Sequence, residues 1–169
     1  MEQQKTKNNK YQMLMFIINA IIGLVVIIGL VVIRVKKEKA ADTYVRNIIE
    51  INNELDLMVN DIDQNIRLAI DKETKAIFIE KIESYMDEWS IIADKIEKIE
   101  PPSRLTNYHL LTIQKTKLVY DVLKNAYEVA LSYRSETLEY LNNYEDTILQ
   151  FRKLKEKQTQ ELEKLARRN

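Results

Sequence analysis

Residues 11–33 form an unbroken stretch of 23 residues without a charged side chain, YQMLMFIINAIIGLVVIIGLVVI. A helix of about 20 apolar residues is long enough to cross the hydrocarbon core of a bilayer. A cleaved signal peptide has a shorter apolar region of about 7–15 residues and ends in small residues, but the pair Ala40-Ala41 lies beyond a cluster of cations. The sequence therefore predicts an uncleaved transmembrane signal anchor over residues 11–33.

The anchor divides the chain into a short N-terminal tail (1–10), a basic juxtamembrane segment (34–43) and a larger domain (44–169). Cations flank both ends of the anchor in nearly equal number, so the positive-inside rule gives no clear orientation. Moving a tail with three lysines across a membrane is unfavourable, whereas long following domains translocate largely regardless of charge. We therefore expect a single-pass protein of the cell membrane with its C-terminal domain on the extracytoplasmic side.

The domain after the anchor has the composition of an all-α protein. Both glycines of the chain, Gly23 and Gly29, lie in the anchor, and its two prolines are adjacent at 101 and 102. Sheets and hairpins depend on glycine for tight turns. The chain also lacks cysteine, which excludes disulfides and thiolate chemistry.

Two apolar stripes with alternating steps of three and four residues predict two helices. The first stripe consists of Val45, Ile48, Asn52, Leu55, Val59, Ile62, Ile66 and Ala69. The second consists of Phe78, Ile82, Tyr85, Trp89, Ile92, Ile96 and Ile99. The stripes are out of phase by two residues, so the polar segment 71–74 is predicted to be a turn, with Asp71 as an N-cap. Trp89 and Ile92 should be buried, and Asn52 is a polar residue within an apolar seam that can fix register.

The pair Pro101-Pro102 marks the clearest helix boundary, because the residue before a proline is disfavoured in the α region. Pro102 suits the first turn of a new helix. No glycine or proline follows it, which favours a single long third helix and thus an antiparallel bundle of three long helices. The alternative is a four-helix up-and-down bundle, with a bend near residues 134–143, where Arg134-Ser135-Glu136-Thr137 and Asn142-Asn143 are candidate positions.

Charge is unevenly distributed along a chain whose net charge is zero. Residues 40–150 contain 12 Lys/Arg and 21 Asp/Glu, whereas the tail 151–169 contains 7 Lys/Arg and 3 Glu. An acidic body thus lies between a basic juxtamembrane segment and a basic C-terminal tail. We expect the partners to be the lipid bilayer and a protein of the cell envelope. The basic ends also suit an anionic lipid or polymer, while the acidic body argues against nucleic acid.

The sequence offers no set of residues for catalysis, a metal or a cofactor. His109 is the only histidine and is expected to be a surface or half-buried residue; zinc sites need clusters of His or Cys. Asp61-Ile-Asp63-Gln-Asn65 imitates the start of an EF-hand loop, but Ile66 and Lys72 stand where the loop needs glycine and a carboxylate. No phosphate loop or nucleophile motif is present. We therefore expect a protein that is not an enzyme.

The segment KIEKIEPPSRLTNYHLL, with Pro101, Pro102 and His109, resembles a pattern in small single-pass or lipid-anchored helical-bundle envelope proteins of Gram-positive bacteria. The resemblance implies an extracytoplasmic helical bundle and no activity. Together these observations favour a membrane-anchored binding or scaffolding protein of the cell envelope. A cytoplasm-facing coiled-coil scaffold and the input domain of a sensor are the alternatives.

Overall fold

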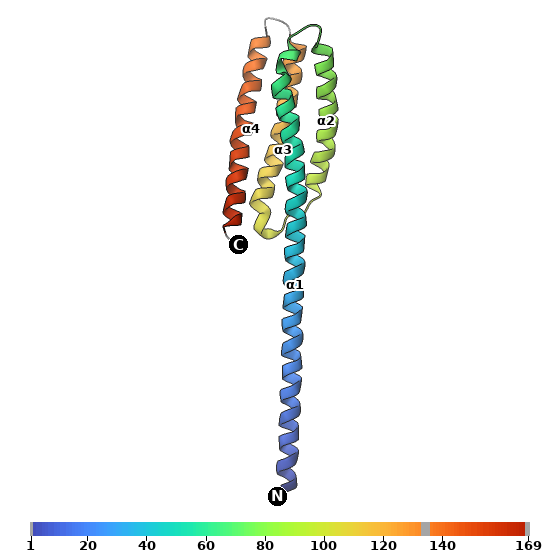
Figure 1. The fold of residues 1–169 in the computed structure, drawn as a ribbon, viewed down its shortest axis with the longest axis vertical. Helices are drawn as coiled ribbons and strands as arrows, with labels where there is room; N and C mark the ends of the chain where they lie inside the picture. The colour runs from blue at the N-terminus through green and yellow to red at the C-terminus, as the bar shows by residue number, and fades with distance from the viewer. Residues whose placement is uncertain (1, 133–135, 168–169) are drawn as a thin grey trace. The chain divides into compact units, whose positions relative to one another are not determined.

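The structure is a computed structural model that describes the backbone of residues 2–132 and 136–167 and the side chains of residues 24–132 and 136–167. The described chain is all-helical (Figure 1). Its α-helices are α1 (Glu2–Asn65), α2 (Lys75–Glu97), α3 (Thr106–Leu131) and α4 (Thr137–Ala166). Two short 3-10 helices, η1 (Ile66–Ala69) and η2 (Ser103–Leu105), lie in the connections.

The chain separates into two compact units, Met1–Asp42 and Thr43–Asn169. The first unit is the N-terminal part of α1. Its described apolar side chains, from Leu24 to Ile33, project outward on every side of the helix. Among the residues with described side chains, no helix is long and apolar enough to span a bilayer. The side chains of residues 11–23 of the predicted anchor lie outside the described part of the chain.

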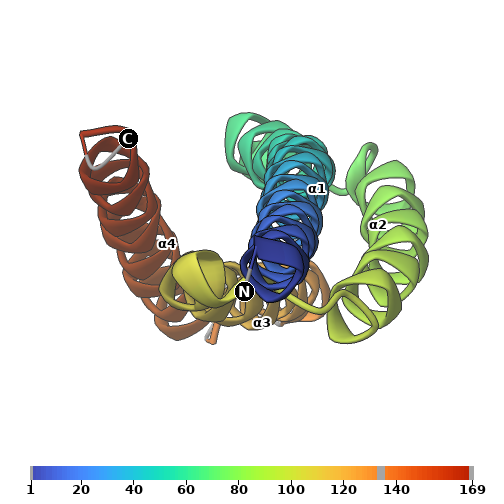
Figure 2. The same cartoon turned by 90° about the horizontal axis from the view of Figure 1, so that it is seen from below.

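The second unit is a bundle of four helices, formed by the C-terminal part of α1 together with α2, α3 and α4. Successive helices run in opposite directions, and α2 and α4 lie on opposite sides of α1 and α3 (Figures 1 and 2). The predicted stripes supply much of the core: Ile48, Leu55 and Ile62 of α1 are fully buried, as is Ile82 of α2. The all-α prediction is confirmed, and the four-helix alternative is the arrangement found.

The preferred prediction of one long third helix was wrong, because the helix ends at Leu131 and α4 begins at Thr137. Ser132 adopts an extended conformation. Its hydroxyl forms hydrogen bonds with the Val129 carbonyl (2.8 Å) and the Thr137 hydroxyl (2.9 Å). Serine and threonine hydroxyls compete with the helical hydrogen-bond ladder, so the helix ends here without glycine or proline. Residues 133–135, within the predicted bend, lie outside the described part of the chain.

Two smaller boundary predictions also need correction. The N-cap of α2 is Thr74, not Asp71, whose carboxylate instead accepts the backbone N–H of Glu73 (2.9 Å) within the connecting turn. Pro102 precedes the short helix η2 rather than lying in the first turn of α3. In both cases a short turn with its own hydrogen bonds separates the two long helices, so the predicted break is correct but the predicted first residue of the next helix is not.

Candidate functional site

A layer of hydrogen-bonded polar side chains crosses the bundle core and joins α1, α3 and α4. Asn52 donates from Nδ2 toward the hydroxyls of Tyr108 and Thr112, each at 3.3 Å. Gln158 donates to Asn52 Oδ1 (3.1 Å) and to the Thr112 hydroxyl (3.2 Å). All four residues are buried. Because a buried polar group is costly unless it is paired, this layer favours one alignment of the three helices over any shifted one.

A charged cluster lies one helical turn from this layer. Lys115 of α3 is 1% exposed, and its Nζ lies 2.5 Å from Asp56 Oδ1 and 3.2 Å from the Asn52 carbonyl. Lys155 of α4 approaches the other carboxylate oxygen of Asp56 at 2.9 Å. Burial lowers the pKa of Lys115, and the adjacent Asp56 carboxylate acts in the opposite direction. The Nζ atom also lies 5.5 Å from the centroid of the Phe151 ring, within the range of a cation–π contact.

The lone histidine is more buried than its sequence context suggested. His109 is 7% exposed, and its ring centroid lies 5.9 Å from that of Tyr44, which is also buried. Neither His109 Nδ1 nor the Tyr44 hydroxyl has a hydrogen-bond partner among the described residues. Burial lowers the pKa of His109. A neutral imidazole packed on an aromatic ring is therefore part of the core, and the prediction of a surface or half-buried histidine was wrong.

The carboxylates that imitate an EF-hand loop lie on a helix and form cross-helix contacts. Asp61 accepts the Tyr85 hydroxyl (2.9 Å) and pairs with Lys81 (2.8 Å), and these contacts lower its pKa. Asp63 pairs with Arg152 of α4 at 2.8 Å. Among the described residues no group of acidic or histidine side chains could hold a metal ion. Asp61 connects α1 to α2, and Asp63 connects α1 to α4.

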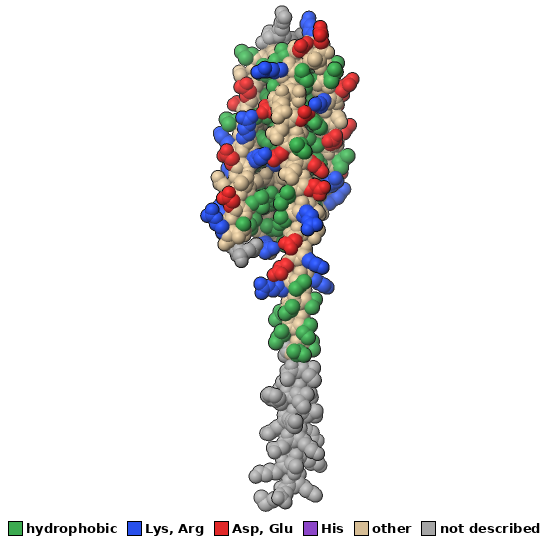
Figure 3. Space-filling model, in the orientation of Figure 1, with side chains coloured by type: hydrophobic (Ala, Val, Ile, Leu, Met, Phe, Trp, Pro, Cys, Tyr) green, Lys and Arg blue, Asp and Glu red, His purple; other side chains and the backbone are tan. Residues whose placement is uncertain are grey.

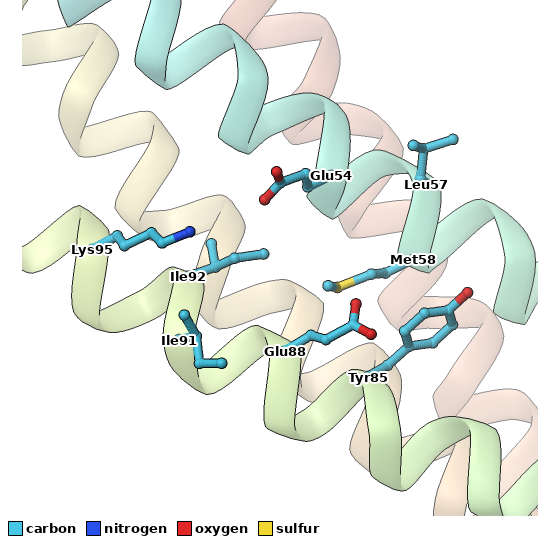
Figure 4. A pocket seen from close by; sticks show the side chains of 8 residues that line it. All are labelled: Glu54, Leu57, Met58, Tyr85, Glu88, Ile91, Ile92 and Lys95. Carbon is cyan, nitrogen blue, oxygen red and sulfur yellow. The ribbon is translucent and has the colours of Figure 1, made fainter.

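An apolar groove on the surface of the bundle lies between α1 and α2 (Figure 4). It has a volume of about 370 Å³ and is lined by Glu54, Leu57, Met58, Tyr85, Glu88, Ile91, Ile92 and Lys95. Met58 and Ile92 are buried in its floor, whereas Leu57 (68% exposed) and Ile91 (58% exposed) stand at its rim. Large apolar side chains exposed around a concavity are typical of a protein interaction site.

Two of the three charged side chains that line this groove are acidic. Glu54 and Glu88 project toward its opening from opposite helices, and Lys95 lies at one end (Figure 4). Neither glutamate forms an ion pair with another residue that the structure describes, in contrast to Asp56 and Asp61. Their charges are thus available to a partner. The groove can hold an apolar side chain flanked by cations, and its side chains include no nucleophile with an adjacent base.

Sequence reasoning did not find this groove. Leu57 and Ile91 fall outside the two predicted stripes, and an apolar residue on the polar face of an amphipathic helix was the available signal. Lys115 was missed because a charged residue is rarely fully buried, although it follows Thr112 and precedes Val119 on the inward face of α3. The groove and the Lys115–Asp56 pair each combine residues of two helices, so a pattern within one segment does not reveal them.

Comparison with known proteins adds no relative: the chain matches no family model, no curated protein and no solved structure. The groove, the buried polar residues and the apolar N-terminal helix are the features of the described chain that bear on its function.

Proposed function

We propose that this chain is a membrane-anchored helical-bundle protein of the cell envelope, which acts by binding and scaffolding other proteins and not as an enzyme. The observation that carries the proposal is the apolar surface of the N-terminal unit. Side chains from Leu24 to Ile33 are 46–62% exposed on all faces of the helix. A helix that is apolar all round is stable when it is buried or in a membrane. Joined to the uncharged residues 11–23, this surface reaches the length of a bilayer span.

Two further features support a binding role for the bundle. Its core is rigidly specified by the polar layer of Asn52, Thr112 and Gln158, which suits a scaffold that presents a fixed surface. The groove between α1 and α2 then offers apolar and acidic groups at fixed positions. We propose the extracytoplasmic side for the bundle, because long domains translocate largely regardless of charge, whereas Lys5, Lys7 and Lys10 beside the anchor disfavour movement of that flank.

Membrane fractionation tests the anchor. The full chain should remain in the membrane pellet after an alkaline carbonate wash. The double variant Leu24→Arg/Val25→Arg, close to the middle of residues 11–33, should move to the supernatant, since each arginine at the centre of a span costs about 2.5–3.5 kcal/mol. A matched control, Ile70→Arg/Ile77→Arg, introduces the same two charges at exposed positions of the bundle and should stay in the pellet. Retention of the Leu24→Arg/Val25→Arg variant in the pellet would contradict the anchor.

The absence of cysteine allows a clean test of orientation. A cysteine introduced at the exposed position Gln160 of α4 should react with a membrane-impermeant maleimide on intact spheroplasts. A cysteine in the N-terminal tail, as in Asn8→Cys, should react only after permeabilisation. The reverse pattern would favour the cytoplasm-facing scaffold instead.

A further inference from the structure

The outward surface of α4 carries groups that complement the α1–α2 groove. Lys153 and Lys157 are exposed and lie one turn apart, and the half-exposed Leu154 lies between them on the same side of the helix. We call these three residues the α4 docking face. Neither lysine forms an ion pair with another described residue, whereas Lys155 and Arg152 are paired with α1. The docking face thus presents an apolar side chain flanked by two available cations.

The docking face also lies at the same level of the bundle as the groove. The contacts of Asn52 with Gln158 and of Asp56 with Lys155 place Glu54 level with residues 156–157 of α4. Met58 lies one turn beyond Glu54 on α1 and is therefore level with Lys153 of α4. Glu88 of α2 faces Met58 in the groove and lies at the same level (Figure 4). Two bundles standing side by side at equal height would bring Lys157 to Glu54 and Lys153 to Glu88.

The groove and the docking face belong to opposite sides of the same molecule. Seen along the bundle, α2 lies on one side of α1 and α3, and α4 lies on the other (Figure 2). Acidic and basic side chains are both visible over the flanks of the bundle (Figure 3). When the groove of one copy binds the docking face of a second copy, the docking face of the first and the groove of the second remain unoccupied. Such a heterologous contact repeats and builds a row.

We propose that the α1–α2 groove binds the α4 docking face of a second copy of this chain, so that neighbouring bundles form side-by-side rows at the membrane. Leu154 enters the apolar groove between Leu57 and Ile91, and the two lysines meet Glu54 and Glu88. Opposite charges arranged at matching spacing select this partner and this register. The proposal rests on the proposed membrane anchor, which gives all copies the same orientation and raises their effective concentration, so that a small interface suffices.

Cysteine cross-linking of the full chain in liposomes tests this contact, because the natural chain contains no cysteine. Proteins with Ile91→Cys and with Leu154→Cys are reconstituted together and oxidised. A disulfide-linked dimer should form in the mixture and should be at least about tenfold less abundant in either protein alone. A dimer of Ile91→Cys with itself would overturn the proposal, since it requires two grooves to face each other. Absence of cross-linking in the mixture would overturn it too.

A second cysteine pair tests the same contact in case Leu154→Cys impairs folding. Ser84 of α2 and Gln150 of α4 are exposed. Ser84 lies one turn from Glu88 of the groove, and Gln150 lies one turn from Leu154 of the docking face. The pair Ser84→Cys and Gln150→Cys should therefore cross-link in the mixture in the same way. Cross-linking of neither pair, in protein that retains its helical circular dichroism, would contradict side-by-side docking.

Charge reversal provides the decisive comparison. Glu88→Lys in the groove protein, or Lys153→Glu in the docking protein, should each lower the yield of the Ile91–Leu154 cross-link about tenfold. Combining the two reversals should restore the yield, because the pair is then inverted but intact. The matched control, Glu80→Lys, adds the same charge to an exposed position of α2 away from the groove and should leave the yield unchanged. A yield that is unchanged by both Glu88→Lys and Lys153→Glu would overturn the proposed register.

The same samples separate failure of docking from failure of the anchor. Flotation of the liposomes reports membrane attachment independently of cross-linking. Protein that floats with the liposomes but does not cross-link would overturn the row and leave the anchor intact. Protein that does not float would overturn the anchor and, with it, the common orientation on which the row depends.

Discussion

Lys115 of α3 and Asp56 of α1 form an ion pair in the bundle core, with 2.5 Å between Nζ and Oδ1. The lysine side chain is 1% exposed and the aspartate side chain 18%. Transferring two charges out of water is costly, and the mutual attraction offsets this cost only while both partners are present. Removing one partner should therefore cost more free energy of unfolding than the intact pair contributes in net stabilisation.

Asp56→Ala should lower the free energy of unfolding by about 3–5 kcal/mol, because it leaves the Lys115 ammonium buried without its partner. Urea denaturation of residues 40–169 measures this change. Asp94→Ala is the matched control: it removes the exposed Lys98–Asp94 pair on α2 and should cost no more than about 1 kcal/mol. Equal small losses in the two variants would contradict a buried, coupled Lys115.

Trp89 on α2 should contribute strongly to stability although it is only half-buried. Its Nε1 donates to the Thr116 carbonyl at 2.7 Å, and its ring lies 4.8 Å from that of Tyr120. Trp89→Ala should lower the free energy of unfolding by about 2–3 kcal/mol, below the range for a fully buried ring. Trp89→Phe keeps an aromatic ring and should cost about 1 kcal/mol for the lost hydrogen bond.

The control for both tryptophan variants is Asp87→Ala, an exposed change on the same helix that should stay within about 0.5 kcal/mol. Thermal or urea denaturation of residues 40–169 compares the three proteins. If Trp89→Ala behaves like Asp87→Ala, the packing of α2 on α3 does not depend on this ring.

The parts of the fold that the sequence predicted are those determined by local periodicity. The first stripe is buried from Ile48 to Ala69 with the exception of the half-buried Ile66. The second stripe is buried at Phe78, Ile82, Ile92 and Ile96, whereas Trp89, which was predicted to be buried, is half-buried. Asn52 was recognised as a polar residue in the seam, and its partners Tyr108 and Thr112 are found on another helix. Such partners are separated by more than 50 residues, so no spacing rule within a segment reveals them.

Each incorrect or missed prediction has a physical cause. Ser132 ends α3 through side-chain hydrogen bonds, which are weaker signals in a sequence than glycine or proline. His109 was expected near the surface because a lone polar residue usually lies there, but Tyr44 packs against its ring. The α1–α2 groove required two apolar residues, Leu57 and Ile91, to be brought together from different helices. Sequence periodicity gives the face of each helix but not which faces meet.

His109 should make the bundle less stable in mild acid. Burial lowers its pKa, so below pH 6.5 the unfolded chain binds a proton that the folded chain does not. The free energy of unfolding then falls with decreasing pH, by at most about 1.4 kcal/mol per pH unit for one proton. Asp61, whose pKa is lowered by Lys81 and Tyr85, adds a loss only below its unfolded pKa, near pH 4.

Urea denaturation between pH 7 and pH 5 separates the two groups. His109→Leu should remove the loss of stability in this range, whereas Asp61→Asn should retain it and change the behaviour only in stronger acid. An unchanged pH profile for His109→Leu would show that another group is responsible.

Buried tyrosines should destabilise the bundle in alkaline solution. Burial and the neighbouring Asp61 raise the pKa of Tyr85 to about 12, and burial also raises the pKa values of Tyr44, Tyr108 and Tyr144. A group whose pKa is raised on folding contributes stability below its unfolded pKa, here 10.0, and loses it as the pH rises toward the folded value. Lys115 acts in the opposite direction, because its pKa is lowered, but one lysine is outnumbered by four tyrosines.

The free energy of unfolding should therefore fall above pH 10, and the tyrosinate absorbance of these four residues should appear together with the loss of helical circular dichroism. In Tyr85→Phe/Tyr144→Phe the decline with pH should be shallower, although the two lost hydrogen bonds to Asp61 and Asp63 lower stability at neutral pH. Ionisation of every tyrosine near pH 10 in a chain that stays helical would contradict the burial of these hydroxyls.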